Sequence, residues 1–181
     1  EMKARGATKD EFLKEVVKIE GTYVPKFYDV SYNEDGTIKS FSKNYDAAPD
    51  KIKKRIIKDF DSCFAPDNII VPFMEVVHDR IMLEIFRGCI RGCRFCQAGM
   101  IYRPVRERSP ETLLDLARRL IKNTGYEEIS LSSLSTSDYT KLKELTDGLL
   151  ELTENEKISL SLPSLRLDNF SMELMQKVQK V

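Results

Sequence analysis

From residue 73 onwards, short apolar strand patterns alternate with amphipathic helix patterns along the sequence. The strands are predicted over residues 76–86, 128–134 and 157–162. The helices are predicted over residues 109–124, 138–152 and onwards from Ser171. Repeated strand–helix units of this length favour a parallel sheet with helices packed against its outside. We therefore expect an α/β fold for this part of the chain.

The first of these helices carries its own start and stop signals. Ser109 is a preferred N-cap residue, and Pro110 suits the first helical position, where a backbone N–H has no helical partner. Gly125 readily adopts the left-handed conformation that closes many helices. The helix is therefore predicted to run between Ser109 and Gly125.

Three strand–helix units are too few to close a (β/α) barrel, which uses about eight. We expect residues 73–181 to form the first half of such a barrel, a partial (β/α) barrel of about three βα units. The strand at 157–162 would then present an unpaired parallel edge, which is a template for pairing with another chain. We expect self-association by domain swapping or edge pairing, or a missing remainder of the barrel that belongs to a longer natural protein.

Residues 1–72 are expected to form a small α+β accessory region. Thr8 and Glu11 have the spacing of a helix capping box, and the turn sequence at 33–36 joins two strand patterns into a predicted β-hairpin. The hairpin strands are predicted over residues 22–32 and 37–41. A short basic helix is predicted over 49–60, and a proline-punctuated connector follows it.

The charge balance argues against several classes of partner. The chain has 29 basic and 29 acidic side chains, so its net charge gives no general attraction to nucleic acid or to an anionic membrane surface. The many charges in the first residues do not resemble a secretory signal peptide, and no run of about 18 apolar residues could span a bilayer. We expect a cytoplasmic protein with no membrane partner.

Three of the four cysteines, Cys89, Cys93 and Cys96, lie close together directly after the predicted strand 76–86. Such short loops strain a disulfide, whereas the C-x3-C-x2-C spacing suits the thiolate ligands of one metal centre. Three thiolates hold three irons of a 4Fe-4S cube and leave the fourth iron open, as chemistry on an added ligand requires. Cys63 lies apart among apolar residues and is expected to pack as a small hydrophobe.

The stretch 87–97, with an aromatic residue directly before the last cysteine, resembles the defining motif of the radical S-adenosylmethionine (SAM) superfamily. The resemblance implies that Cys89, Cys93 and Cys96 hold a 4Fe-4S cluster whose open iron chelates SAM. Reductive cleavage of SAM would give a 5′-deoxyadenosyl radical that abstracts hydrogen from an unknown substrate. Phe95 would lie at the adenine end of the SAM site; the alternative is that its ring packs beneath the cluster.

The flanking stretches 75–80 and 99–109 resemble a subfamily whose full-length members carry an amino-terminal cobalamin-binding domain. That resemblance implies cobalamin as a further cofactor, held by a domain that is not visible in this chain. One segment departs from the superfamily: a Gly-Gly-Glu-like sequence usually follows the second strand and holds the SAM amino group, whereas Ser132 and Ser133 stand there here. Both serines become candidates for that role, and helix capping is the alternative.

Arg166 lies at the end of the third predicted strand, where (β/α) barrels place their sites. A guanidinium group offers a fixed fork of donors that suits the carboxylate of SAM. The alternative is a surface ion pair with Asp168.

Two other classes of function compete with a radical SAM enzyme. Six arginines lie between residues 87 and 108, where they would suit RNA or a phosphate-bearing substrate, or else balance an anionic cluster. His78 or Cys63 would instead complete a closed structural zinc or iron-sulfur site. The favoured prediction is a radical SAM enzyme whose isolated half-barrel is inactive, because other strands would supply half of the SAM pocket.

Overall fold

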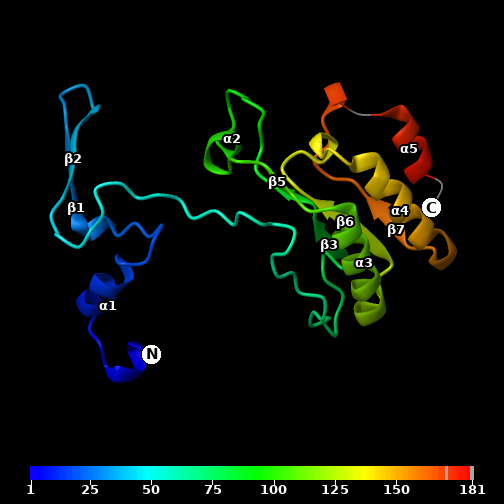
Figure 1. Ribbon diagram of the computed structural model, residues 1–181, viewed down its shortest axis with the longest axis horizontal. Coiled ribbons are helices and arrows are strands. Elements are labelled where there is room, and N and C mark those ends of the chain that lie inside the picture. Colours follow the sequence, from blue (N-terminus) through cyan, green and yellow to red (C-terminus); the bar gives the residue numbers. More distant parts are fainter. Residues whose placement is uncertain (170, 180–181) are drawn as a thin grey trace. The chain divides into compact units, whose positions relative to one another are not determined.

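The structure, a computed structural model, describes residues 1–169 and 171–179. Within it the chain separates into two units, Glu1–Ile57 and Lys58–Val181, and each unit has its own hydrophobic cluster (Figure 1). The expected boundary between an accessory region and a barrel at residue 72 stays a prediction.

A three-stranded parallel sheet lies at the centre of the second unit. Its strands, in spatial order, are β3 (Ile81–Glu84), β6 (Glu128–Ser132) and β7 (Ser159–Ser161). Ile81, Ile129 and Leu160 lie opposite one another in register, and Leu83 lies opposite Leu131. Because side chains alternate between the two faces of a strand, these five all point to one face. The expectation of an α/β fold with a parallel sheet is confirmed.

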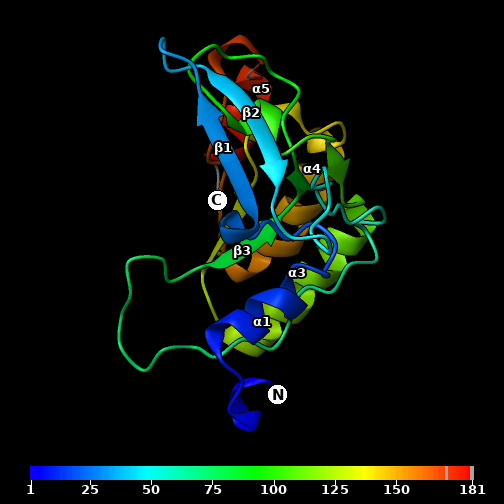
Figure 2. The same ribbon diagram turned by 90° about the vertical axis from the view of Figure 1, so that its left-hand side faces the viewer.

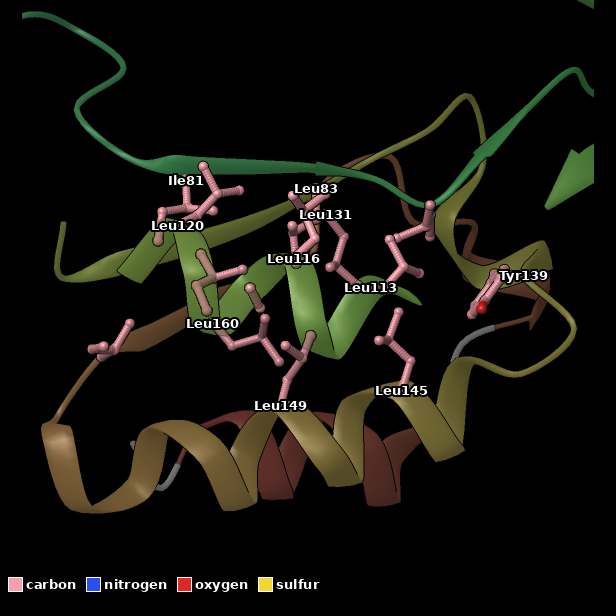
Figure 3. Packing of buried hydrophobic residues seen from close by; sticks show 14 of the residues in the cluster. Ile81, Leu83, Leu113, Leu116, Leu120, Leu131, Tyr139, Leu145, Leu149 and Leu160 are labelled. Carbon is pink, nitrogen blue, oxygen red and sulfur yellow. The ribbon is translucent and has the colours of Figure 1, made fainter. Parts of the chain in front are cut away.

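Two long helices cover that face of the sheet. They are α3 (Pro110–Thr124), which precedes β6, and α4 (Leu142–Thr153), which precedes β7. Figure 3 shows their buried leucines packed with the strand residues; they are Leu113, Leu116, Leu120, Leu145 and Leu149. Complete burial of a leucine side chain is worth about 1.5–3 kcal/mol. This packing therefore fixes the direction of all three strands and the position of their carboxyl ends.

The ends of α3 agree with the sequence prediction. The Ser109 hydroxyl accepts a hydrogen bond from the Thr112 backbone N–H at 3.2 Å, and Pro110 takes the first helical position. Gly125 closes the helix in the left-handed conformation, at φ +70°, which other residues adopt only with strain. The length of α3 is thus set by local signals that the sequence displays.

The opposite face of the sheet carries mostly polar side chains, with Met82 as the exception. Met82, Ser130 and Ser161 lie side by side in register, and Glu84 lies beside Ser132 in the next row. Serine and glutamate side chains supply little apolar surface to a core. This face is therefore better suited to line a site than to pack against a second apolar layer.

The first unit contains the predicted helix and hairpin. Helix α1 (Lys9–Val16) begins with the Thr8–Glu11 capping box, and β1 (Tyr28–Tyr32) pairs antiparallel with β2 (Ile38–Lys43), as Figure 2 shows. The first strand starts later than predicted, because Pro25–Phe27 forms a 3-10 turn in which the proline ring fixes φ. The small cluster that supports this unit consists of Val17, Val24, Phe27, Tyr28 and Ala48.

The predicted helix over residues 49–60 is wrong: the structure describes all of this segment and assigns no helix to it. A helix would place like charges four residues apart, as at Lys51 and Arg55, and such pairs destabilise a helix. The segment instead packs Ile52 against the cluster of the first unit and leaves Ile57 40% exposed. Its isoleucines therefore do not form one buried helical face.

The remaining elements are short. The strand predicted over 76–86 forms from Ile81 only, and the residues before it, such as the 88%-exposed Val77, pair with no strand. The last helix, α5 (Met172–Val178), starts at the predicted N-cap Ser171 and buries Leu174. Within the described ranges, no helix combines the length and apolar character that crossing a bilayer requires.

Replacing Leu149 by alanine tests the packing of the sheet against α4. Leu149 is fully buried, so Leu149→Ala is expected to lower the free energy of unfolding by about 2–5 kcal/mol, through lost burial and a residual cavity. The measurement is urea denaturation followed by circular dichroism. The matched control is Leu167→Ala, because Leu167 is 99% exposed. Equal losses in the two variants would contradict the described core.

Candidate iron-sulfur site

The three cysteines lie in an excursion between two short strands. β4 (Phe86–Arg87) follows β3 and pairs antiparallel with β5 (Arg106–Glu107), so the two ends of the excursion meet. We call residues 88–105 the cysteine loop. In Figure 1 the loop, which includes α2, stands beyond the carboxyl end of β3. This is the end of a parallel sheet at which α/β proteins place their ligands.

Two glycines fold the cysteine loop tightly on itself. Gly88 has φ +99°, and a Cβ atom on it would lie 2.7 Å from the carbonyl oxygen of Pro104. A Cβ atom on Gly99, in the short helix α2 (Ala98–Ile101), would overlap the carbonyl oxygen of Arg91. The segment that carries the cysteines therefore packs backbone to backbone against α2, at a distance that only glycine allows.

The arginines of this region have partners inside the protein. Arg103 donates to the carbonyl oxygens of Cys89 and Ile90, at 3.4 and 3.2 Å, and Arg106 donates to that of Pro104 at 3.0 Å. The Arg103 bonds join the two arms of the cysteine loop, and the Arg106 bond lies at the end of its second arm. Guanidinium groups held in this way stabilise the loop, so the number of arginines in this region does not by itself indicate an RNA-binding surface.

Arg87 and Arg108 flank the loop and are engaged as well. Arg87 makes a two-point ion pair with Glu84, at 2.6 and 2.8 Å. Arg108 is buried, donates to the carbonyl oxygen of Cys63 at 3.1 Å, and stacks 4.4 Å above the ring of Phe60. A buried guanidinium is tolerated only with such partners. Arg108 therefore anchors the segment before β3 to the base of the cysteine loop.

Asp138 connects the cysteine loop to the segment that follows β6. Both oxygens of its carboxylate accept hydrogen bonds from Arg91, one of them from Nε at 2.8 Å. The same carboxylate accepts from the Ser135 hydroxyl at 2.8 Å and from the Asn169 side-chain amide at 3.1 Å. The Arg91 guanidinium, and to a smaller extent these other donors, hold the pKa of Asp138 well below its ordinary value, against the opposing effect of burial.

Arg166 lies between an acid and a cysteine. Its Nη2 donates to Asp168 at 2.7 Å, and its Nη1 lies 3.7 Å from the Sγ of Cys93. The hydrogen bond from Arg166 lowers the pKa of the Asp168 carboxyl. The structure thus contains the predicted ion pair with Asp168, while the contact with the SAM carboxylate stays a prediction. The approach of the guanidinium to Cys93 was not predicted from the sequence.

The cysteines fit thiolate ligation by their donor set and surroundings. Cys89 and Cys93 are half-buried, Cys96 is exposed, and all three are free thiols. The Arg166 guanidinium, 3.7 Å from the Cys93 sulfur, is a hydrogen-bond donor of the kind that surrounds the sulfur ligands of metal centres. Among the residues that the structure describes, no three Cys, His, Asp or Glu side chains lie close enough together to hold a metal ion. The loop therefore has a defined fold at the carboxyl end of the sheet, but its three thiols lie too far apart to bind one metal ion together.

The other predicted site residues lie at the same end of the sheet or on the loop. Phe95 is 93% exposed on the cysteine loop. Ser132 ends β6, and its carbonyl oxygen accepts from the Ile85 backbone N–H at 3.0 Å. The Ser133 hydroxyl lies 2.9 Å from that of Thr136. Neither Ser132 nor Ser133 is an N-cap residue, because the 3-10 helix Thr136–Asp138 starts after Ser135 and α4 starts after Lys141.

His78 and Cys63 do not join the three cysteines. His78 Nδ1 lies 3.4 Å from the Arg80 guanidinium, and the carbonyl group of Cys63 is bound to Arg108. The Cys63 thiol is half-buried, with the Phe64 carbonyl oxygen 3.7 Å away. A closed four-ligand metal site that uses either residue is therefore not favoured.

A parallel sheet with a three-cysteine loop at its carboxyl edge defines an α/β protein with a candidate iron-sulfur site. The family profile described as the radical SAM superfamily matches residues 83–181, more than half of the chain, and the chain belongs to this superfamily. The superfamily implies a 4Fe-4S cluster and SAM in general. An uncharacterised protein of Methanocaldococcus jannaschii is 37% identical over 95 residues, which are 52% of this chain. The match spans only 20% of that relative's length.

Sequence reasoning missed the role of Asp138 and of its partner Arg91. The two residues are 47 positions apart, and nothing in their spacing indicates that they meet. The signal in the sequence was Asp138 itself, an acid that follows the small polar residues 135–137 after the predicted strand 128–134. An arginine-rich stretch, residues 87–108, was expected at the same edge of the sheet. That signal marks a candidate anion partner for the loop, but it does not say which arginine reaches it.

Replacing Gly99 by alanine tests the close approach within the cysteine loop. The new Cβ would meet the Arg91 carbonyl oxygen, so Gly99→Ala is expected to displace the loop and to destabilise the second unit by about 1–3 kcal/mol. The measurement is hydrogen–deuterium exchange of peptides from residues 88–105. Gly92→Ala is the control, since a Cβ there has no neighbour within 4 Å. Unchanged exchange in Gly99→Ala would contradict the described packing.

Proposed function

We propose that this chain holds a 4Fe-4S cluster on Cys89, Cys93 and Cys96, and that the cluster binds SAM at its open iron. One observation carries the proposal: a loop with three free thiols stands at the carboxyl end of a parallel sheet in a member of the radical SAM superfamily. Three thiolates supply ligands to three irons and leave the fourth for SAM.

When bound, such a cluster supplies the electron for reductive cleavage of SAM to a 5′-deoxyadenosyl radical, which takes a hydrogen atom from the substrate. The residues of this chain place the ligands and set the local charge. Arg166 points a cationic donor at Cys93, and donors to ligand sulfurs tune the potential of a cluster. The backbone contact at Gly99 holds the cysteine segment in one fold.

The proposed contacts to SAM come from three neighbouring segments. Phe95 presents an exposed ring that would pack on the adenine, and Arg166 offers its guanidinium to the carboxylate. Ser132 and Ser133, at the carboxyl end of β6, would accept from the amino group. The carboxyl ends of β6 and β7 lie at one edge of the sheet, beside the cysteine loop that carries Phe95, which supports the proposal that these groups bind one SAM molecule.

The polar sheet face and the two edge strands support a (β/α) barrel of which this sheet is one part. In such barrels the helices cover the outside and the other face of the sheet lines the interior. Here α3 and α4 cover one face, and we propose that the serine-rich face would line the interior. β3 and β7 lie at the edges of the sheet, where further strands or a second copy of the chain would pair. Half of the SAM pocket would then come from those strands.

The substrate and any use of cobalamin are not defined by the described site. Cobalamin is supported by the sequence resemblance of stretches 75–80 and 99–109 alone. Free thiols at the proposed site favour a reducing compartment such as the cytoplasm.

Anaerobic reconstitution with iron and sulfide tests the three proposed ligands. The wild-type protein is expected to become brown, and Cys89→Ala, Cys93→Ala and Cys96→Ala are each expected to lose most of the bound iron, because two thiolates hold a cube poorly. Iron content and visible absorption are the measurements. Cys63→Ala is the matched control and should keep its iron, since Cys63 lies outside the cysteine loop.

The reaction itself is tested by chromatography of the reduced, reconstituted full-length protein with SAM, because strands outside this chain would supply half of the SAM pocket. Formation of 5′-deoxyadenosine by the protein, and its absence in the three cysteine variants, is the expected result. Full iron loading of the cysteine variants, or a colourless protein that binds only zinc, would refute the proposed site.

Replacing Arg166 tests its proposed contact with SAM. Loss of a charged donor to a carboxylate weakens binding by about tenfold or more, so Arg166→Gln is expected to raise the Kd of SAM by that factor. Arg166→Lys should restore part of the affinity. Asp168→Asn is the control, because it removes the ion pair and keeps the guanidinium. If Asp168→Asn weakens SAM binding as much as Arg166→Gln does, Arg166 acts through the ion pair and the proposed contact is wrong.

A further inference from the structure

Three separate segments of the second unit meet at one carboxylate, that of Asp138. Arg91 comes from the cysteine loop, Ser135 from the segment after β6, and Asn169 from the segment after β7. All three donate hydrogen bonds to the same side chain. A single carboxylate therefore joins the loop that carries the proposed metal ligands to the carboxyl ends of two strands.

The Asp138 side chain is shielded from water, with 11% of its surface exposed against 34% for Arg91. Charge-assisted, two-point contacts between a guanidinium and a carboxylate are among the stronger polar interactions, and reduced contact with water strengthens them further. This pair is thus unlike the exposed ion pairs of the helices, such as Lys177 with Asp147 on α5 and α4.

The backbone that presents Asp138 is itself held in place. The next residue, Tyr139, is 3% exposed; its ring stacks on that of Phe86 and its hydroxyl donates to the Arg108 carbonyl oxygen at 2.7 Å. The Thr140 backbone N–H then donates to Glu107 at 3.1 Å. Phe86 and Glu107 belong to β4 and β5, at the base of the cysteine loop. Asp138 is therefore fixed relative to both ends of the loop.

The segments after β6 and β7 are tied together beside this carboxylate. The Asn169 amide also donates to the Ser137 carbonyl oxygen at 2.8 Å, and the Arg166 backbone N–H donates to the Ser137 hydroxyl at 3.2 Å. The segment that positions Asp138 thus also positions Arg166, whose guanidinium reaches Cys93.

We propose that Asp138 is a positioning residue for the proposed cluster: through Arg91 it holds the cysteine loop over the carboxyl ends of β6 and β7, with Cys93 against Arg166. Asp138 bonds to no cysteine, so it acts through the loop and not as a ligand. Such a contact preorganises the site. A loop that is already held in its binding conformation loses less conformational entropy when the cluster binds. The positioning role rests on the proposed function, because it concerns the cluster. The contact between Asp138 and Arg91, which we call the tether, can be tested without metal.

The first experiment is hydrogen–deuterium exchange of the metal-free protein under reducing conditions, with Asp138→Asn, Arg91→Gln and the double variant. Loss of this partly buried, charge-assisted contact is expected to speed the exchange of peptides from residues 88–105 by about tenfold in each single variant. Because both residues belong to one contact, the double variant should exchange no faster than either single one. Asp147→Asn is the matched control, since it breaks an ion pair of the same unit that does not involve the loop.

The second experiment separates positioning from general stability. After anaerobic reconstitution, electron paramagnetic resonance of the reduced Asp138→Asn protein is expected to show an altered cluster signal, whereas Asp147→Asn shows the wild-type signal. If Asp138→Asn is too unstable to be prepared, Arg91→Gln replaces it, because Arg91 is the more exposed partner.

The outcomes distinguish the tether from the proposed function. Wild-type exchange rates in residues 88–105 of both single variants, or exchange in the double variant that is the product of the two single effects, would overturn the tether. A wild-type cluster signal in Asp138→Asn would overturn its positioning role. Failure of the wild-type protein itself to take up iron, with the exchange results as expected, would count against the proposed function and leave the tether standing.

Discussion

The burial of one apolar face of the parallel sheet under α3 and α4 is the constraint on which the rest of the second unit depends. Ile81, Ile129 and Leu160 lie in register across three strands, and the leucines of both helices cover them. Strands held in this way must end at a common edge, because they are parallel and in register. The cysteine loop, the segment after β6 and the segment after β7 all start near that edge. Apolar packing thus brings polar groups together that lie far apart in the sequence.

Polar contacts then organise this edge, and they explain the local excess of arginine. Arg87, Arg91, Arg103, Arg106 and Arg108 each have a carboxylate or carbonyl partner within the second unit. The loop is therefore a compact, internally bonded structure before any cofactor arrives. Cationic groups close to the thiols also favour the anionic ligands of an iron-sulfur cluster. A cation-rich loop in a chain with no net charge is consistent with this local role.

Much of the fold could be predicted, because its signals are local. The caps of α3 at Ser109 and Gly125, and the capping box of α1, each depend on a few residues that are close in sequence. The structure confirms all of them. The cysteine motif and the family assignment are equally local. The helix predicted over 49–60 is wrong because repulsion between its lysines and arginines opposes a helix, although its isoleucines have helical spacing. The bonds of Arg91 to Asp138 and of Arg166 to Cys93 could not be predicted, because they depend on how separate strands are placed in space.

The central claim is that Cys89, Cys93 and Cys96 hold a cluster with one iron open to SAM. Electron paramagnetic resonance of the reduced, reconstituted full-length protein with and without SAM tests it most directly, since only an open iron can change its ligands when SAM is added. The account predicts a 4Fe-4S signal that shifts on addition of SAM and that is absent when any one of the three cysteines is replaced. A signal that SAM leaves unchanged, or one that survives replacement of a cysteine, would contradict it.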